Sequence, residues 1–135
     1  MACAERYAAS PSEDDGTDVR FFCATPIFSV ADLQASLRHY EHALGFEVAW
    51  QWGEPATFAA VRSGNVDVFF CEGCQGQSGT HIMVFVDDVD TLHDEYRRRG
   101  AKITRPPTDE PWGMREMWVE DLDGHVLRLG QGTSN

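Results

Sequence analysis

The feature that most constrains this chain is an internal repeat. Residues of the same type recur at a nearly constant separation of 55 or 56 positions, in the pairs Val30 and Val86, Asp32 and Asp88, Tyr40 and Tyr96, and Gly45 and Gly100. A repeat of this size corresponds to one supersecondary unit that occurs twice and buries its apolar face against its neighbour. The chain is therefore expected to fold as two related halves.

Each half has the pattern of a strand, a helix and three further strands. In the first half the helix begins near Ser29 or Asp32 as a cap, and apolar residues recur at helical spacing until Gly45 ends it. In the second half Asp88 caps a helix that Gly100 ends. Strands are expected at residues 21–28, 46–52, 58–62 and 66–71, and again at 81–86, 101–105, 114–120 and 124–129.

These elements predict an α+β fold of two β-α-β-β-β repeats. Each helix covers one face of a four-stranded, mostly antiparallel sheet, and the two sheets form a half-open cup. Residues 1–20 are polar and acidic and are expected to be a disordered tail, and the domain spans residues 21–131, with repeats at 21–74 and 80–131. Within residues 46–52, alternation places Val48, Trp50 and Trp52 on one face.

The net charge of −11 bears on the possible partners. Nucleic acids and anionic membranes are polyanions, so neither is expected to bind. The charge suits a cationic ligand, although surplus surface acid that keeps a small protein soluble explains it as well. No apolar run approaches the roughly 20 residues that span a bilayer, and the N-terminus lacks a signal-peptide pattern, so a cytoplasmic protein is predicted.

The chain has four cysteines, at Cys3, Cys23, Cys71 and Cys74. In a chain without a signal peptide they are expected to be reduced. Cys71 and Cys74 have the spacing of half a zinc site or of a redox pair, but no second pair accompanies them and the motif does not open a helix. The favoured interpretation is two thiols without a special role.

The segment from Pro111 to Gly130 predicts a β-hairpin. Residues 114–120 have strand composition, residues 126–129 form a second apolar run, and Asp-Leu-Asp-Gly between them is a turn. Before the hairpin, Pro111 restricts φ and Gly113 frees it, which holds Trp112 on a short loop. An indole in this position either plugs the core or forms the wall of a ligand site.

This hairpin carries a family resemblance. Pro-Trp-Gly, then Arg-Glu, a short strand, Asp-x-Asp-Gly and a last strand resemble the C-terminal end of bleomycin-resistance proteins. Those proteins belong to the glyoxalase, bleomycin resistance and dioxygenase superfamily, also called vicinal oxygen chelate proteins. The resemblance extends over residues 21–131. It implies that the paired units line a cavity and that two chains form a homodimer.

The resemblance also indicates where a metal would bind. In metal-dependent members the ligands come from the first and last strands of each half, and these positions fall on Thr25, Phe69 (or Phe70), His81 and Arg128. Only His81 is a good ligand, because phenylalanine coordinates nothing and arginine is a cation without an acceptor. No metal and no other cofactor is therefore expected, which removes the chemical basis for metal-dependent glyoxalase, extradiol dioxygenase or fosfomycin-transferase activity.

What remains is a cavity with aromatic and acidic side chains, which suits planar or cationic organic molecules. The residues expected to bind such a ligand are Trp112, Glu116, Trp52, Phe69, His81, Trp118 and Arg128, with Phe58, Asp67 and Glu120 nearby. Trp112 is the strongest candidate, because its loop matches the drug-contacting loop of the family that this chain resembles. Glu116 is expected to contribute charge from the adjoining strand.

Two functions are consistent with these residues. The first is a bleomycin-resistance-like protein that sequesters a small molecule and has no catalytic residues, and the missing metal ligands favour it. The second is a metal-dependent or altered-site enzyme of the same superfamily, a lyase, isomerase or dioxygenase, in which His81 would act as an acid or base.

Overall fold

The computed structural model describes residue 19, residues 23–74 and residues 76–133, so most of the predicted tail lies outside the described residues. The first half contains β1 (Ile27–Val30), α2 (Leu33–Leu44), β2 (Glu47–Gly53), β3 (Ala56–Ser63) and β4 (Val66–Glu72). The second half contains β5 (His81–Phe85), α3 (Val89–Arg99), β6 (Lys102–Asp109), β7 (Met114–Glu120) and β8 (Val126–Gly132). The two predicted β-α-β-β-β units are confirmed.

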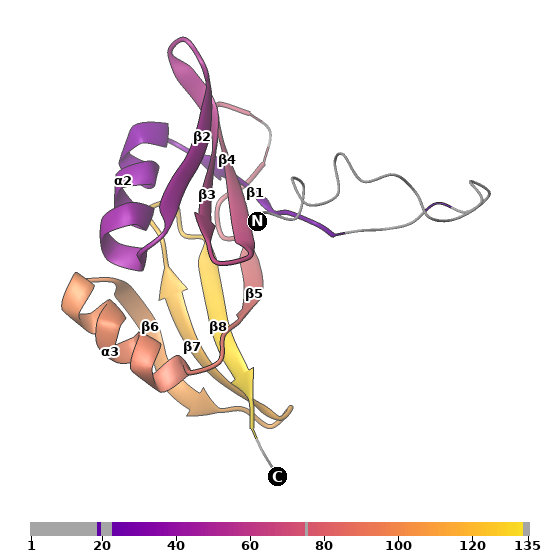
Figure 1. The fold of residues 1–135 in the computed structure, drawn as a ribbon, viewed down its shortest axis with the longest axis vertical. Coiled ribbons are helices and arrows are strands. Elements are labelled where there is room, and N and C mark those ends of the chain that lie inside the picture. Colours follow the sequence, from indigo (N-terminus) through magenta and orange to yellow (C-terminus); the bar gives the residue numbers. More distant parts are fainter. Residues whose placement is uncertain (1–18, 20–22, 75, 134–135) are drawn as a thin grey trace.

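Each half forms its own four-stranded sheet, and both helices lie on the same side of the two sheets (Figure 1). The strand order is β1-β4-β3-β2 in the first sheet and β5-β8-β7-β6 in the second. Among the described residues only β1–β4 and β5–β8 pair in parallel, so both sheets are mostly antiparallel. The predicted α+β fold is confirmed, and the described strands do not close into one barrel.

Both helices begin and end at the predicted capping residues. The side chains of Asp32 and Asp88 each accept a hydrogen bond at 3.1 Å from the backbone N–H three residues on, a group that has no partner within the helix. Gly45 and Gly100 follow with φ of 75° and 80°, a conformation that residues with a Cβ rarely adopt. No described helix is long and apolar enough to cross a bilayer.

A single apolar core lies between the helices and the sheets. It runs through both halves, from Leu33 and Leu37 of α2 to Val119, Leu127 and Leu129 of the second sheet. The two repeats therefore pack against each other within one chain. Burial on this side leaves the opposite face of each sheet free for other side chains.

A β-bulge overturns one of the predicted faces. Val48 lies opposite Val61, and Trp50 lies opposite Ala60, so β2 advances two residues while β3 advances one. Val48 consequently packs against the core, whereas Trp50 lies on the other face beside Phe69. The prediction that Val48 and Trp50 share a face is wrong, because the extra residue inverts the alternation.

The first strand also differs from its prediction. It begins at Ile27, because it pairs in parallel only with residues 69–72 of β4. Residues 23–26 precede it without strand structure, and residues 21 and 22 lie outside the described part. The strand predicted from the hydrophobic composition of residues 21–28 therefore begins and ends too early in the chain.

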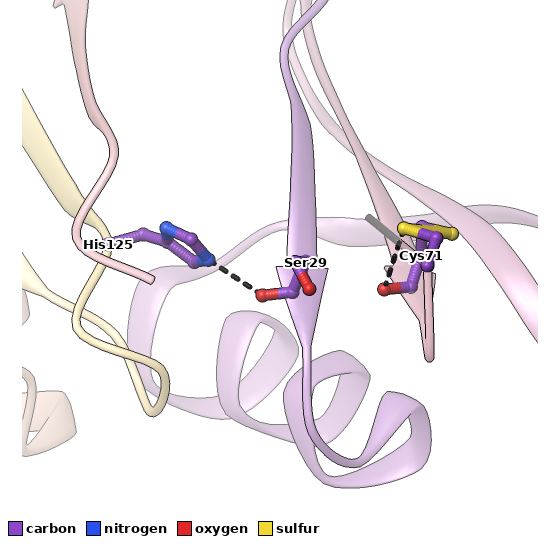
Figure 2. Close-up of a disulfide and its surroundings, with 4 residues drawn as sticks. Ser29, Cys71 and His125 are labelled. Carbon is purple, nitrogen blue, oxygen red and sulfur yellow. Dashed lines mark hydrogen bonds between the residues drawn. A yellow bond between two sulfur atoms is a disulfide. The ribbon is translucent and has the colours of Figure 1, made fainter. Parts of the chain in front are cut away.

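His125, to which the sequence analysis assigned no role, joins the two halves. Its ring stacks on Phe28 with centroids 4.2 Å apart, and Nε2 donates to the backbone oxygen of Ser29 at 2.8 Å (Figure 2). Nδ1 accepts a hydrogen bond from the backbone N–H of Thr80 at 3.1 Å, which requires the proton to be on Nε2. The side chain is completely buried, so a turn residue of the second half completes the packing of β1.

The repeated tyrosines provide two further links between the halves. The hydroxyl of Tyr40 donates to Asp121 at 2.8 Å, and that of Tyr96 donates to the backbone oxygen of Leu44 at 2.9 Å. Burial raises the pKa of both hydroxyls, so both remain protonated donors at neutral pH. The repeat in the sequence therefore includes residues that hold its two copies together.

Cys71 and Cys74 form a disulfide at the end of β4 (Figure 2). The turn between them brings their Cα atoms to 5.8 Å, within the range that a disulfide bridges. Cys23 is disulfide-bonded as well. The expectation of reduced thiols is wrong for Cys23, Cys71 and Cys74, because it was drawn from the predicted compartment and not from the local geometry.

Candidate functional site

The strongest candidate site lies on the face of the second sheet opposite the core. Along β7, Met117 and Val119 are buried in the core, whereas Glu116 and Trp118 alternate onto the opposite face. On β8, Arg128 lies directly opposite Trp118 in the strand register. Regular strand geometry thus brings together three of the residues predicted from the sequence.

Glu116 is the centre of this group and is only 1% exposed. Its carboxylate accepts hydrogen bonds from three side chains, namely Trp112 Nε1 at 2.6 Å, Trp118 Nε1 at 3.1 Å and Arg128 Nε at 2.9 Å. Burial by itself raises the pKa of this carboxyl, but the hydrogen bonds from these three donors outweigh burial and lower the pKa below its ordinary value. Glu116 is therefore ionised at neutral pH.

The guanidinium of Arg128 lies beside both indoles. Its central carbon is 4.8 Å from the ring centroid of Trp118 and 5.8 Å from that of Trp112, within cation–π range. The same group forms an ion pair with Glu116 at 2.9 Å. We refer to Trp112, Glu116, Trp118 and Arg128 as the indole–guanidinium cluster.

Arg105 extends this cluster and was missed by the sequence analysis. Its guanidinium lies 5.7 Å from the ring centroid of Trp118 and pairs with Glu110 at 2.9 Å. The register of β6 shifts on both sides of Arg105. Strand alternation could therefore not place this residue, and only its position across from Trp118 identifies it.

The loop before β7 holds Trp112 at the edge of the cluster. The backbone N–H of Gly113 donates to the oxygen of Glu110 at 3.2 Å, and the N–H of Glu110 donates to the oxygen of Met114 at 2.7 Å. Gly113 has a φ of 87°, which this tight loop requires. The Trp112 indole is 58% exposed although its N–H is bonded to Glu116. A pocket of about 290 Å³ lies beside it, lined by Met83, Phe85, Trp112, Met114, Glu116 and Arg128.

His81 lies at the border of the cluster, at the start of β5. Its ring meets the ring of Trp118 edge-on, with centroids 5.7 Å apart. The side chain is exposed to solvent. Five of the seven residues predicted to bind a ligand thus lie close together on the second sheet and on the loop before β7.

The other two predicted residues, Trp52 and Phe69, lie on the first sheet. Phe69 packs against Trp50 and Phe58, with ring centroids 5.0 Å and 5.7 Å away. Trp52 is exposed and lines a separate pocket of about 670 Å³ with Trp50, Gln51, Thr57, Phe58 and Cys71. Within this chain the structure therefore places Trp52 and Phe69 apart from the other five predicted residues, because each half forms its own sheet.

The two surfaces occupy equivalent positions in the repeat. Phe69 lies opposite Ile27 of β1, and Arg128 lies opposite Met83 of β5. Ile27 and Met83 are 56 residues apart, which is the offset of the repeat, so Arg128 takes the position that Phe69 has in the first half. By the same register Glu116 stands where the first half has Phe58. One half therefore presents an aromatic surface, and the other presents an ion pair between indoles.

The carboxylates that the sequence analysis placed near the cavity are all paired with cations. Asp67 pairs with Arg62 at 2.9 Å, and Glu120 forms an ion pair with Lys102. Glu116 is likewise committed to Arg128. In this structure its carboxylate holds the neighbouring side chains, and a contribution of charge to a ligand stays a prediction.

The positions implied for a metal have other roles in this fold. Arg128 is bound to Glu116, Phe69 belongs to the aromatic surface of the first sheet, and Thr25 precedes β1. Within the described residues no group of three or more His, Cys, Asp or Glu side chains could hold a metal ion. That no metal binds stays a prediction.

The family model for the Glyoxalase/Bleomycin resistance protein/Dioxygenase superfamily matches residues 23–129. No curated protein sequence matches the chain. Several solved structures share the fold.

The crystal structure of TioX from Micromonospora sp. ML1 is 23% identical, with a TM-score of 0.70 over 80% of this chain and 96% of that one. The bleomycin-binding protein from bleomycin-producing Streptomyces verticillus, complexed with copper(II)-bleomycin, is 25% identical, with a TM-score of 0.69 over 87% of this chain and 100% of that one. A bleomycin resistance determinant encoded on the transposon Tn5 is 22% identical, with a TM-score of 0.70 over 82% and 97%.

Proposed function

The chain belongs to the glyoxalase/bleomycin resistance protein/dioxygenase superfamily, and from this we propose that it binds and sequesters a planar organic molecule without changing it chemically. The observation that carries the proposal is the Trp112 indole, which is 58% exposed yet held by a hydrogen bond to a buried carboxylate. A side chain that is ordered before binding loses little conformational freedom when a ligand stacks on it.

Similarity to known binding proteins supports this proposal. The Streptomyces verticillus protein, which is 25% identical and has the same fold, is a bleomycin-binding protein solved with copper(II)-bleomycin. The pocket beside Trp112 has about 290 Å³, close to the lower end of the range for small-molecule sites. Its walls are mostly apolar, with one ion pair at the base, as is typical of sites for small organic ligands.

Of the two ligand types expected from the sequence, the geometry favours the planar type. A cationic ligand would need a free carboxylate or an open aromatic face. Glu116 is already paired with Arg128, and the guanidinium of Arg128 lies where a ligand cation would stack on the indoles. The exposed part of Trp112 can stack on an uncharged aromatic ring, whereas the adjacent guanidinium of Arg128 repels a ligand cation from it.

A second function, catalysis by His81 as an acid or base, is favoured by the position of this ring beside Trp118. Loss of substrate turnover in His81→Ala with ligand affinity unchanged would support it. Unchanged turnover, or no turnover of any bound compound, would leave sequestration as the function. A homodimer is also expected from the family, and light scattering after size-exclusion chromatography would measure it.

The proposal is tested by a thermal-shift screen with planar aromatic compounds and bleomycin-type glycopeptides, since a ligand of the folded state raises the melting temperature. For a compound that binds, Trp112→Ala should cost about 1–3 kcal/mol of binding free energy, by analogy with base–aromatic stacking. The same substitution should lower the free energy of unfolding by about 1.5–2 kcal/mol, the lower part of the range for a hydrogen bond to a charged group, because the exposed indole contributes little buried surface.

Trp52→Ala is the matched control, because it truncates another exposed indole, 68% exposed against 58% for Trp112, on the other sheet. It should leave the affinity unchanged. A loss of affinity in Trp52→Ala alone would move the site to the first sheet. A loss of about 3–5 kcal/mol of stability in Trp112→Ala with unchanged affinity would show that Trp112 is a packing residue.

A further inference from the structure

We propose that the indole–guanidinium cluster selects planar molecules that carry an anionic group, such as an aromatic carboxylate. This inference rests on the proposed binding of a planar ligand and adds the sign of the ligand's charge. It runs against the net charge of the chain, which is −11. Three features of the described residues lead to it.

The first feature is the unequal exposure of the ion pairs on this face. Arg128 is 28% exposed and Glu116 is 1%, and Arg105 is 41% exposed and Glu110 is 6%. The pair of Lys102 and Glu120 shows the same order, with the cation more exposed. A molecule that approaches this face therefore meets cations and indoles, while the carboxylates lie underneath.

The second feature is the unused hydrogen-bonding capacity of Arg128. Its Nε and one terminal nitrogen, Nη2, are directed at the same oxygen of Glu116, both at 2.9 Å. Its other terminal nitrogen, Nη1, has no protein acceptor among the described residues. Because a guanidinium has five N–H donors and no acceptor, what it offers to the adjoining pocket is a charged donor. Such a donor bonds most strongly to an anionic oxygen.

The third feature is the distance over which charge acts. The surplus negative charge of the chain is spread over its whole length, and at physiological salt a charge is largely screened beyond about 8 Å. The two charged residues that line the pocket are Arg128 and Glu116, and a ligand meets the 28% exposed guanidinium rather than the 1% exposed carboxylate beneath it. The net charge therefore does not predict which ligand this pocket prefers.

Three naphthalene probes of similar size test this proposal, namely 2-naphthoate, neutral 2-naphthalenemethanol and cationic 2-naphthylmethylammonium. Affinities are measured by isothermal titration calorimetry near neutral pH in about 0.15 M salt. We expect 2-naphthoate to bind at least about tenfold more tightly than the ammonium compound, with the alcohol in between. The preference for an anion can only come from the local site, because the net charge of the chain acts in the opposite sense.

Substitutions then assign the preference to Arg128. Arg128→Gln should remove the advantage of 2-naphthoate over the alcohol, whereas Lys102→Gln, which removes the same charge from the same face outside the pocket lining, should preserve it. If Arg128→Gln does not fold because Glu116 is left buried without its partner, the double variant E116Q/R128Q removes the pair together. That variant should bind the alcohol and 2-naphthoate with equal affinity.

The outcomes separate this inference from the proposed function. Equal affinity for all three probes, or tightest binding of the ammonium compound, would overturn the charge preference while leaving planar-ligand binding in place. An advantage of 2-naphthoate that persists in both Arg128→Gln and E116Q/R128Q would also overturn it. No binding of any probe at about 1 mM would count against the proposed function and would remove this inference with it.

Discussion

Replacing Glu116 with glutamine is the sharpest single test of the site geometry. The side chain keeps its size but exchanges one carboxylate oxygen for an NH₂ group, which cannot accept a hydrogen bond. In the native protein the two oxygens together accept from Trp112, Trp118 and Arg128. After the substitution at least one of these donors loses its acceptor, and Arg128 loses its counter-charge.

The size of the effect follows from burial. Removing one member of a buried ion pair costs about 3–5 kcal/mol, and a hydrogen bond to a charged group contributes about 1.5–3 kcal/mol. Arg128 is 28% exposed, so water can solvate its guanidinium once Glu116 is neutral. We therefore expect a loss of about 2–3 kcal/mol in the free energy of unfolding. For a domain of this size that corresponds to a fall of about 8–12 °C in melting temperature.

Urea denaturation followed by circular dichroism measures this loss, and Glu120→Gln is the matched control. Glu120 lies on the same strand and pairs with Lys102, but its side chain is 29% exposed and that of Lys102 is 65% exposed. Exposed pairs contribute about 0–1 kcal/mol, so the control should lose less than about 1 kcal/mol. Equal losses in the two variants would refute the central role assigned to Glu116.

The stability difference between wild type and Glu116→Gln should also depend on pH, which provides a second check. The pKa of Glu116 is lower in the folded protein than its ordinary value of 4.5. The ionised carboxylate therefore stabilises the fold fully at pH values above this ordinary pKa, and its contribution is lost as the pH falls through the lower pKa of the folded state. A protonated Glu116 resembles glutamine. The stability difference between wild type and Glu116→Gln should therefore shrink on acidification, and a difference that grows would contradict the assigned ionisation.

Two further predictions concern the framework around the site. His125→Phe should keep the stacking on Phe28 but lower the free energy of unfolding, measured by urea denaturation, by about 1–3 kcal/mol, because Ser29 and Thr80 lose their hydrogen-bond partner. A loss below about 0.5 kcal/mol would contradict the role of His125 in joining the halves. Under oxidising conditions the double variant C71S/C74S should have a free energy of unfolding about 2 kcal/mol lower than the wild type, because the disulfide closes a short loop in the unfolded chain. Unchanged stability would show that the disulfide adds no constraint.

The sequence predicted much of the fold because its signals are local. Helix ends depend on a cap and a glycine, and Asp32, Gly45, Asp88 and Gly100 all lie where those signals placed them. The 56-residue offset added long-range information, because it required two similar units. The strand over residues 114–120 was also correct at both ends, since its alternation has no bulge.

The errors arose where geometry depends on the partner strand or on distant residues. The bulge between Val48 and Trp50 has no signature in β2 alone, because it is defined by the register against β3. The separation of Trp52 from Trp112 follows from the formation of two sheets, which strand alternation cannot reveal. The role of His125 becomes visible only when the turn before β8 packs against β1.

The repeat itself shows why the ion pair in the second half calls for a functional explanation. At the positions of Glu116 and Arg128, the first half has Phe58 and Phe69, and it forms the same kind of sheet. Apolar residues that pack well are often as stabilising as a buried ion pair or more so, so fold stability alone gives no reason for the charges. What Glu116 adds is an anchor for two indole N–H groups and one guanidinium, and it holds Trp112 in place while leaving that ring accessible. This arrangement orders exposed aromatic surface without covering it, and it is the reason we propose that a ligand binds there.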